Sequence, residues 1–401
     1  MSERIKNKVF SLITFFIVLS IIFYSFEYFL FNSQKNLKKI KDDKLLAFNN
    51  AKEKFPNLKP YVNSMFTLNH SEYFPDFFSS STFSKSDIFT CNENGYYPII
   101  KTDRYGFYNN DKIWYQDFEE VFLGDSFTAG SCVNIEDNII SNYKKNFSDK
   151  IVINLGTPGS FPLLELVKLK EYIYGDINYK KPKKIYWLYY EGNDLRELEN
   201  FYNSHKNEEI FKYLNDRNFL QNLIKFDGKR NKELNKSLDY VISLIENKKQ
   251  SKNLHKYRLV HFLTFANIRT LIKDTFFGER QSIDTNTLEL FREIVKLSKE
   301  IIENNGAEFI FVYLPTIERY KTFRAYNLKI YGSSVLDKKL KYNEIMKILN
   351  NLNIKVLNIK NEIFDIQEDA LNLFPFRKHH HYNAEGYKMI GNFIYSKIRD
   401  N

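Results

Sequence analysis

The chain has 401 residues, of which 43% are hydrophobic and 17% aromatic, so it is long enough for a full globular core with attached segments. Its formal net charge is +10, but the basic residues are spread along the whole chain instead of forming one stripe. We interpret the charge mainly as compositional background with some affinity for anionic membrane surfaces, and we predict no nucleic-acid partner.

The first predicted element is a membrane anchor. Residues 9–26 contain no charge, Glu27 interrupts the run, and apolar residues continue to Phe31. A membrane span needs about 20 apolar residues, and no small-residue cleavage site follows this one. We therefore predict a tail over residues 1–8 and an uncleaved single-pass transmembrane signal anchor over 9–31, not a removed signal peptide. Basic residues flank both ends of the span, and we expect the remaining chain on the extracytoplasmic side.

Residues 32–115 are predicted to form a membrane-proximal segment. Residues 34–55 are rich in lysine and fit a helix, whereas residues 56–111 contain turn residues and many aromatic side chains and fit irregular structure or short strands.

From residue 116 onward, short apolar runs recur at mostly helix-length intervals. The predicted strands are residues 120–123, 150–155, 183–190, 307–314 and 354–359. Such runs are typical of buried parallel strands, and their alternation with helices predicts a doubly wound α/β sheet within a domain of residues 116–401. The alternation stops over residues 196–281, where apolar residues recur at helical spacing at Leu234, Leu238, Val241, Ile242 and Ile245. We predict a helical insertion there that caps the ligand-binding side of the sheet.

Polar residues follow the first three predicted strands. Ser126 ends a Gly-Asp-Ser run, Gly156 follows the second strand and Asn193 follows the third. The carboxyl ends of parallel strands meet at one edge, where open α/β sheets bind ligands. A serine nucleophile needs a positioned base, and acyl transfer needs donors for the oxyanion. We predict Ser126 as the nucleophile, with an oxyanion hole made by the N–H groups of Ser126 and Gly156 and the amide of Asn193.

The predicted base is His381, which stands in the run His-His-His-Tyr-Asn-Ala-Glu-Gly-Tyr over residues 379–387 and would reach Ser126 from the loop after the last strand. The three adjacent histidines do not predict a metal site, because their side chains point different ways and no second ligand cluster accompanies them. We expect neither a metal nor a cofactor.

In these residues the chain resembles the SGNH hydrolases, also called the GDSL family of esterases and lipases. The four family markers fall in order on Ser126, Gly156, Asn193 and His381, and the tail has the pattern His-x-Asn-x-x-Gly-Tyr. The resemblance implies a flavodoxin-like sheet and ester hydrolysis or acyl transfer. The nucleophile elbow of the α/β-hydrolases fits less well, because its second glycine would stand where Thr128 stands.

One residue departs from the family pattern. Family members usually carry an aspartate three residues before the histidine, and Lys378 occupies that position here. Another carboxylate or a backbone carbonyl could orient His381, or the site could be impaired. The carboxylates within reach in the sequence are Asp365, Glu368 and Asp369.

Three further acids and two cysteines stand near the predicted site. Asp125 and Asp194 are interpreted as supporting residues that hold loops or cap helices, whereas Glu191 could orient Asn193 or meet the substrate. Cys91 and Cys132 could form a disulfide that pins the membrane-proximal segment beside the site, or remain two buried thiols. In the chain-entropy model this bridge would stabilise the fold by roughly 4 kcal/mol.

These observations predict a membrane-anchored serine esterase that cleaves or transfers an acyl group on an oxygen ester. The expected partners are an ester-bearing small molecule, a glycan or a lipid, with envelope glycans or lipids suggested by the location alone. The alternatives are an O-acyltransferase proper and a non-catalytic glycan-binding protein that kept the fold after losing the triad acid.

Overall fold

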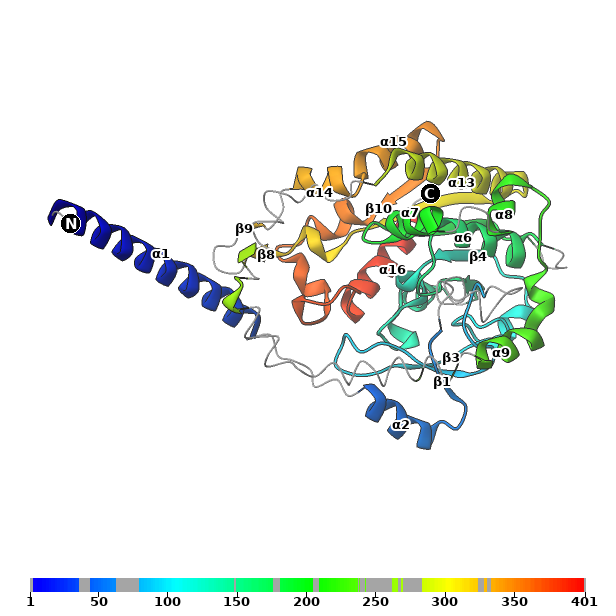
Figure 1. Ribbon diagram of the computed structural model, residues 1–401. Helices are drawn as coiled ribbons and strands as arrows, with labels where there is room; N and C mark the ends of the chain where they lie inside the picture. The colour runs from blue at the N-terminus through cyan, green and yellow to red at the C-terminus, as the bar shows by residue number, and fades with distance from the viewer. Residues whose placement is uncertain are drawn as a thin grey trace. The chain divides into compact units, whose positions relative to one another are not determined.

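The computed structural model describes residues 3–35, 44–62, 79–147, 149–175, 181–204, 209–236, 238, 242, 262–265, 268–269, 283–323, 328–329 and 333–399. The chain divides into two compact units. One consists of Met1–Asp42, Glu246–Arg280 and Phe323–Leu328, and the other contains the remaining residues. Figure 1 shows the elements of both units.

The second unit is built on a five-stranded parallel sheet. Its strands are β4 (Glu120–Gly124), β5 (Val152–Asn154), β6 (Lys184–Tyr190), β7 (Glu308–Leu314) and β10 (Lys355–Asn358). Their spatial order is β10-β7-β6-β4-β5, so the first strand lies between the second and the third. This is the flavodoxin-like order of doubly wound sheets. The predicted fold class is confirmed, and each of the five predicted strands is present.

Helices cover both faces of this sheet because its side chains alternate in direction. Val121 and Leu123 of β4 point into a core beneath α6 (Pro162–Lys168), α7 (Asp194–Ser204), α13 (Thr285–Asn304) and α15 (Tyr342–Asn351). Phe122, between them, points into the opposite core beneath α5 (Ile139–Lys144) and α16 (Ala384–Arg399). A strand that is buried on both faces needs a continuous run of apolar residues. These runs are the pattern from which the five strands were predicted.

Shorter elements complete this unit. The helices are α2 (Lys44–Lys54), α4 (Ser126–Ala129), α8 (Lys212–Asn215), α9 (Asp227–Lys236) and α14 (Ser333–Lys339). A second sheet joins β1 (Leu58–Pro60), β2 (Asp87–Phe89) and β3 (Ile99–Lys101). A two-stranded ribbon joins β8 (Thr322–Phe323) to β9 (Leu328–Lys329), and its residues Phe323 and Leu328 group with the first unit. Single turns of helix lie at Asp111–Tyr115, Ile135–Asp137, Leu169–Ile173, Glu209–Phe211, Leu223–Phe226, Ile317–Arg319, Lys360–Phe364, Ala370–Leu373 and Pro375–Arg377.

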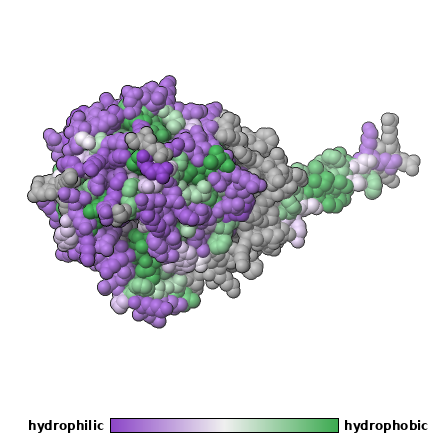
Figure 2. Space-filling view, turned by 180° about the vertical axis from the view of Figure 1, so that it is seen from behind, coloured by the Kyte–Doolittle hydropathy of each residue, from purple (hydrophilic) through white to green (hydrophobic). Residues whose placement is uncertain are grey.

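The first unit contains the apolar N-terminal helix α1 (Glu3–Lys35). Its segment Asn7–Phe29 has a mean hydropathy of 2.4 and is long enough to cross a membrane, as a single-pass anchor or a signal sequence would be. Figure 2 shows its apolar side chains at the surface of the helix. Within the same unit, the ring of Tyr24 lies 4.4 Å from that of Phe265, and Glu27 accepts a hydrogen bond of 2.9 Å from the N–H of Ile268.

The predicted insertion over residues 196–281 is described only in part. Its first portion holds α8 and α9, which belong to the same unit as the parallel sheet, whereas residues 246–280 group with α1. Leu234 is buried, and Val241 and Ile245 lie outside the described residues. The predicted domain boundaries and the capping role of the insertion stay predictions.

We predict that Gly391→Ala destabilises the second unit by about 1–3 kcal/mol, because overpacking of this size has such a cost. A Cβ atom at Gly391 would lie 2.6 Å from the carbonyl oxygen of Ile139 and 2.9 Å from the nitrogen of Tyr143, so α16 and α5 would have to separate. The midpoint of denaturant unfolding measures the change. The matched control is Lys388→Ala on the exposed side of α16, and equal effects of the two substitutions would contradict the prediction.

Candidate active site

Ser126 is presented by a sharp turn after β4. Gly124 has φ +152°, and a Cβ atom there would lie 2.0 Å from Thr128 Oγ1, so no side chain fits at this position. Asp125 caps α4 by accepting a 2.8 Å hydrogen bond from the N–H of Phe127. Ser126 is thus the first residue of the helix, where backbone N–H groups lack intrahelical partners. The turn leaves both its hydroxyl and its N–H at the carboxyl edge of the sheet.

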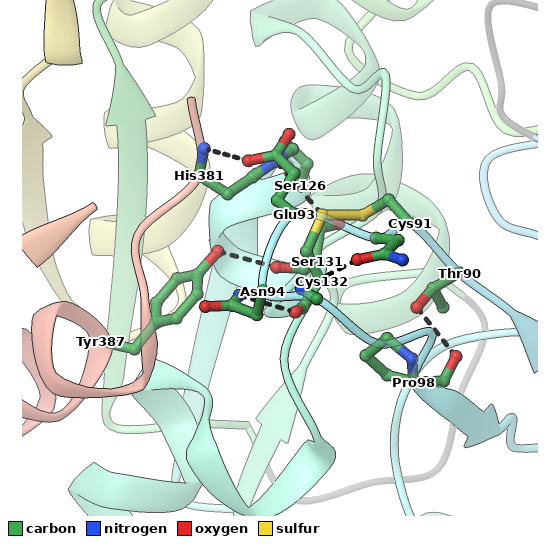
Figure 3. Close-up of a disulfide and its surroundings, with 12 residues drawn as sticks. Thr90, Cys91, Glu93, Asn94, Pro98, Ser126, Ser131, Cys132, His381 and Tyr387 are labelled. Atoms are coloured by element: carbon green, nitrogen blue, oxygen red, sulfur yellow. Dashed lines mark hydrogen bonds and ion pairs between the residues drawn. A yellow bond between two sulfur atoms is a disulfide. The ribbon is translucent and has the colours of Figure 1, made fainter. Parts of the chain in front are cut away.

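The structure brings Ser126, His381 and Glu93 into one line of contacts. Nε2 of His381 lies 2.9 Å from Ser126 Oγ, and Nδ1 lies 3.0 Å from Glu93 Oε1. The backbone N–H of His381 donates to Glu93 Oε2 at 2.9 Å. Figure 3 shows the Glu93 carboxylate facing the histidine. Nucleophile, base and orienting acid are therefore within hydrogen-bond reach of each other, as a serine-hydrolase triad requires.

The charge state of Glu93 suits this arrangement. Burial alone would raise the pKa of its carboxyl, but the hydrogen bond to His381 and the attraction to the imidazole together lower that pKa from 4.5 to about 2. The side chains of Glu93 and His381 are each only 18% exposed, so water screens the pair weakly. An ionised carboxylate at Nδ1 keeps the proton on that nitrogen and leaves Nε2 able to accept the serine proton.

Glu93 is the functional residue that the sequence analysis missed. Of the three acids considered there, Asp365 accepts from Lys360 and Tyr320, Asp369 pairs with Arg377, and Glu368 is exposed. None of these three candidates, which the sequence left unassigned, contacts His381 through these bonds, and the carboxylate that does is Glu93. Cys91 was the feature of the sequence that could have indicated Glu93. A disulfide from Cys91 to Cys132 would bring the carboxylate of Glu93, two residues after Cys91, close to Ser126.

The disulfide between Cys91 and Cys132 is present, with a Cα–Cα distance of 4.9 Å. It lies next to the catalytic histidine, since Cys132 Sγ is 3.5 Å from His381 Nδ1. The side chain of Asn94 donates to the carbonyl oxygen of Cys132 at 2.9 Å and joins the same two segments a second time (Figure 3). The membrane-proximal segment is thus fixed to the turn that follows the nucleophile.

A cavity of about 440 Å³ opens beside the triad. Ser126, His381 and Asn193 all line it, together with Phe127, Tyr190, Gly192, Arg196, Thr316, Glu318, Leu336, Lys339, Leu340 and His380. Of the three predicted oxyanion donors, Ser126 and Asn193 line this cavity, whereas Gly156 is not among the lining residues. Asn193 donates to Glu197 Oε1 at 3.1 Å, and the N–H of Gly156 donates to Asn154 Oδ1 at 2.8 Å. The oxyanion role of these two residues stays a prediction.

The three supporting acids hold loops at the strand ends. The second oxygen of Asp125 lies 3.3 Å from Ser126 Oγ, and Asp194 accepts a 2.9 Å hydrogen bond from the N–H of Tyr190. Glu191 is fully buried and pairs with Arg319 at 2.5 Å. It also accepts from the N–H of Thr316 at 2.7 Å. Glu191 therefore contacts neither Asn193 nor the cavity through these bonds, and it ties the loop after β6 to the loop after β7.

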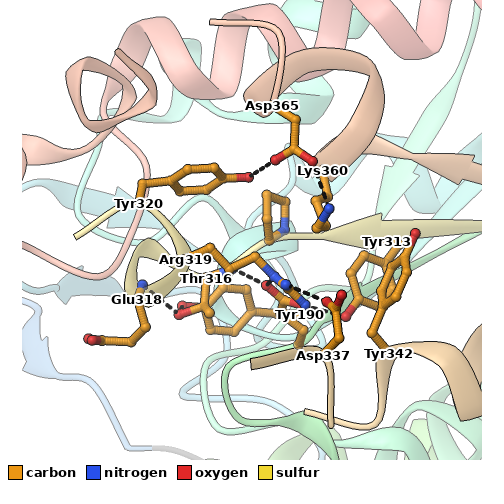
Figure 4. A network of polar contacts seen from close by, with 12 residues as sticks. Tyr190, Tyr313, Thr316, Glu318, Arg319, Tyr320, Asp337, Tyr342, Lys360 and Asp365 are labelled. Carbon is orange, nitrogen blue, oxygen red and sulfur yellow. Dashed lines mark hydrogen bonds and ion pairs between the residues drawn. The ribbon is translucent and has the colours of Figure 1, made fainter. Parts of the chain in front are cut away.

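Arg319 is the centre of this network. Its guanidinium also donates to Asp337 at 2.6 Å, and Figure 4 shows it directed toward Asp337 among the rings of Tyr190, Tyr313 and Tyr342. Burial opposes the charge of Arg319, but the carboxylates of Glu191 and Asp337 overcome that effect and raise its pKa above the ordinary value. The Glu191–Arg319 contact thus connects the loop after β6 to the loop after β7.

Lys168 connects the first two strand ends in a similar way. This buried residue of α6 donates through Nζ to the carbonyl oxygens of Gly124 and Leu155 at 2.9 and 2.8 Å. Burial lowers its pKa to about 8, while the nearby carboxyl groups of Glu165, Asp125 and Asp194 oppose that shift. Lys168 was not singled out from the sequence, where it reads as an ordinary lysine of a surface helix.

The structure is similar to solved structures of GDSL-type hydrolases. A lipolytic protein of the G-D-S-L family from Desulfitobacterium hafniense DCB-2 matches at 14% identity and TM-score 0.34, covering 70% of this chain and 99% of that one. A lipase/acylhydrolase from Enterococcus faecalis matches at 12% identity and TM-score 0.36, covering 71% and 96%. A carbohydrate acetylesterase family member from Sinorhizobium meliloti matches at 10% identity and TM-score 0.33, covering 70% and 97%. No family model and no curated protein matches the chain.

These neighbours are described as a lipolytic protein, a lipase/acylhydrolase and a carbohydrate acetylesterase family member, and the likeness of this chain to them is one of fold.

We predict that Arg319→Met lowers the free energy of unfolding by about 3–5 kcal/mol, because it leaves Glu191 buried without its cation. The double variant Glu191→Gln/Arg319→Met should recover part of this loss, since the uncompensated charge is then removed as well. Denaturant unfolding of the single and double variants measures the difference. A double variant at least as unstable as Arg319→Met would contradict this account of the pair.

We predict a pH-dependent contribution of Glu93 to stability. Because its pKa is about 2 in the folded chain and near 4.5 otherwise, the unfolded chain binds more protons between these values. The stabilisation is present above about pH 4.5, amounts to at most about 3 kcal/mol, and is lost as the pH falls toward 2. The stability gap between the wild type and Glu93→Gln should therefore shrink on acidification, whereas the gap for Glu385→Gln, an exposed control, should stay small throughout. A constant gap for Glu93→Gln would refute this contribution.

Proposed function

We propose that this protein is a membrane-anchored serine esterase. The observation that carries the proposal is the continuous line of contacts from Ser126 Oγ through His381 to the ionised carboxylate of Glu93. A serine at a strand end is common, but a serine whose base is itself oriented by an acid, at the mouth of a cavity, fits nucleophilic catalysis.

In the proposed reaction Ser126 attacks the carbonyl carbon of an ester while His381 Nε2 takes the hydroxyl proton. Glu93 stabilises the imidazolium that forms, without itself taking the proton. Collapse of the tetrahedral intermediate breaks the ester C–O bond, and His381 returns the proton to the departing alcohol. A second cycle with water as the nucleophile releases the acid and regenerates Ser126. A sugar hydroxyl in place of water would make the same acyl-enzyme a transferase.

The N–H of Ser126 is the first donor proposed for the oxyanion, because it lies at the start of α4. The amide of Asn193 is the second, since it lines the cavity. For Gly156 to contribute a third, its N–H would have to leave Asn154 when substrate binds. Catalytic hydrogen bonds often tighten only in the substrate complex, which supports keeping Gly156 in the proposal.

The location is proposed from α1 and the disulfide. A helix able to span a membrane supports a single-pass anchor. Disulfides persist in oxidising compartments, so the Cys91–Cys132 bridge supports a catalytic domain outside the cytoplasm. Acylated glycans or lipids of the cell envelope are the substrates within reach of such an anchored site.

A non-catalytic binding protein is disfavoured by Glu93. That alternative depended on the absence of an acid beside His381, and a carboxylate of low pKa occupies the place.

We predict that the full-length protein in detergent hydrolyses short acyl esters and is labelled by a fluorophosphonate at Ser126. Ser126→Ala and His381→Ala should each lose at least about 10³-fold in kcat. Glu93→Gln should lose roughly 10²–10⁴-fold in kcat with little change in KM, because Glu93 contacts His381 and is not among the residues that line the cavity.

The control is Asp365→Asn, which removes a nearby carboxylate that does not contact His381. Labelling that survives Ser126→Ala, or wild-type activity in Glu93→Gln, would overturn the assignment.

A further inference from the structure

The disulfide joins the two segments that carry opposite ends of the triad. Cys91 lies two residues before Glu93, and Cys132 lies six residues after Ser126, although the two cysteines are 41 positions apart in the chain. The third member is in contact as well, since His381 Nδ1 lies 3.5 Å from Cys132 Sγ and 3.0 Å from Glu93 Oε1. The bridge is therefore adjacent to the contact on which the proposed chemistry depends.

Residues 91–98, which carry Glu93, form no helix or strand, and all but Pro98 are half-buried or exposed. The far end of this segment is held to the residues just before it, because Thr90 donates to the carbonyl oxygen of Pro98 and the ring of Tyr97 stacks on Phe89. The near end faces the turn that follows Ser126. Asn94 donates to the carbonyl oxygen of Cys132 at 2.9 Å, and Gly95 donates to Asn92 within the segment itself. The bridge is thus a covalent connection between this segment and the turn that follows Ser126, and the hydrogen bond of Asn94 accompanies it.

Because Glu93 is charged and largely buried, its segment has to be held in place beside His381. Burial disfavours an ionised carboxylate, and this is the largest single influence on the Glu93 pKa. A segment free to move would take the carboxylate into water, where it is better solvated. A closed bridge reduces the freedom of the chain between the cysteines. Cys132 also has φ +66°, a conformation that non-glycine residues keep only where their surroundings enforce it.

We propose that the Cys91–Cys132 disulfide is a positioning element of the active site, which is competent only in its oxidised form. This inference rests on the proposed esterase function. The two thiols give up two electrons and two protons to a disulfide oxidant as the S–S bond forms, and Glu93 is then held against His381. Reduction by a dithiol reverses the step and yields a cyclic disulfide of the reductant. The enzyme is consequently inactive in a reducing compartment and becomes active after export.

The test compares four states of the full-length protein in detergent: wild type and Glu93→Gln, each oxidised and each reduced with dithiothreitol. Ester hydrolysis and the rate of fluorophosphonate labelling are measured for each, and thiol titration verifies that two thiols appear. EDTA is present throughout, because Cys91, Cys132 and His381 would form a set of metal-binding groups within 4.8 Å once the bridge opens. Cys91→Ser/Cys132→Ser provides a reductant-free form of the open state.

If the bridge acts through Glu93, reduction lowers wild-type kcat by about 10²-fold or more but changes Glu93→Gln by less than about twofold, since the two changes remove the same contact. Equal losses in both backgrounds, or full activity of reduced wild type, would overturn the proposal. Circular dichroism distinguishes a positioning effect from unfolding, because the reduced protein must keep its secondary structure.

A spectroscopic readout separates this inference from the proposed function. A strongly hydrogen-bonded imidazole N–H next to a carboxylate gives a far-downfield ¹H NMR signal, expected in oxidised wild type and absent in His381→Ala and Glu93→Gln. Its loss on reduction supports the positioning role even if no ester is hydrolysed. Its persistence on reduction refutes that role even if the oxidised protein is an active esterase.

Discussion

The contact between Glu93 and His381 is the interaction on which the rest of the site depends. It orients the imidazole, because Glu93 Oε1 lies 3.0 Å from Nδ1 while Nε2 lies 2.9 Å from Ser126 Oγ, the geometry on which the proposed proton transfer is based. It also imposes a structural condition, since the carboxylate comes from a segment that precedes the parallel sheet and has little regular structure. Residues 91–94 are thereby part of the candidate site, although they lie outside the parallel sheet.

Buried charged groups connect the loops at the strand ends, in addition to apolar contacts such as the stacking of Phe127 on Tyr190. Lys168 binds the carbonyl oxygens of Gly124 and Leu155, and the Glu191–Arg319 pair connects the loops after β6 and β7. Such charges stabilise only when their partners are present, which makes each of these positions intolerant of single substitutions. The loops are thus fixed by contacts that a single substitution can remove.

The predictable parts of this protein are those with a local sequence signal. Five buried parallel strands were readable from short apolar runs, and the carboxyl-edge rule brought Ser126 and His381 together across 255 positions of the chain. Glu93 was not readable, because its partner lies 288 positions away and a single glutamate in an irregular segment has no distinguishing pattern. The N–H of Gly156 also differs from expectation, since the side chain of Asn154 competes for it within the same turn.

The position of Glu93 accounts for Lys378, which stands where the SGNH hydrolases that the sequence resembles usually carry an aspartate. When acid and base share one loop, a basic residue at the acid position leaves the histidine without an orienting partner. Here the acid approaches from another segment, so the loop before His381 is free of that requirement, and Arg377 pairs with Asp369 instead. The contact between acid and histidine therefore depends on tertiary structure and not on a residue close to His381 in the sequence. A triad assembled from three distant segments needs something to hold the third, and a covalent bond beside the histidine supplies it without occupying the cavity.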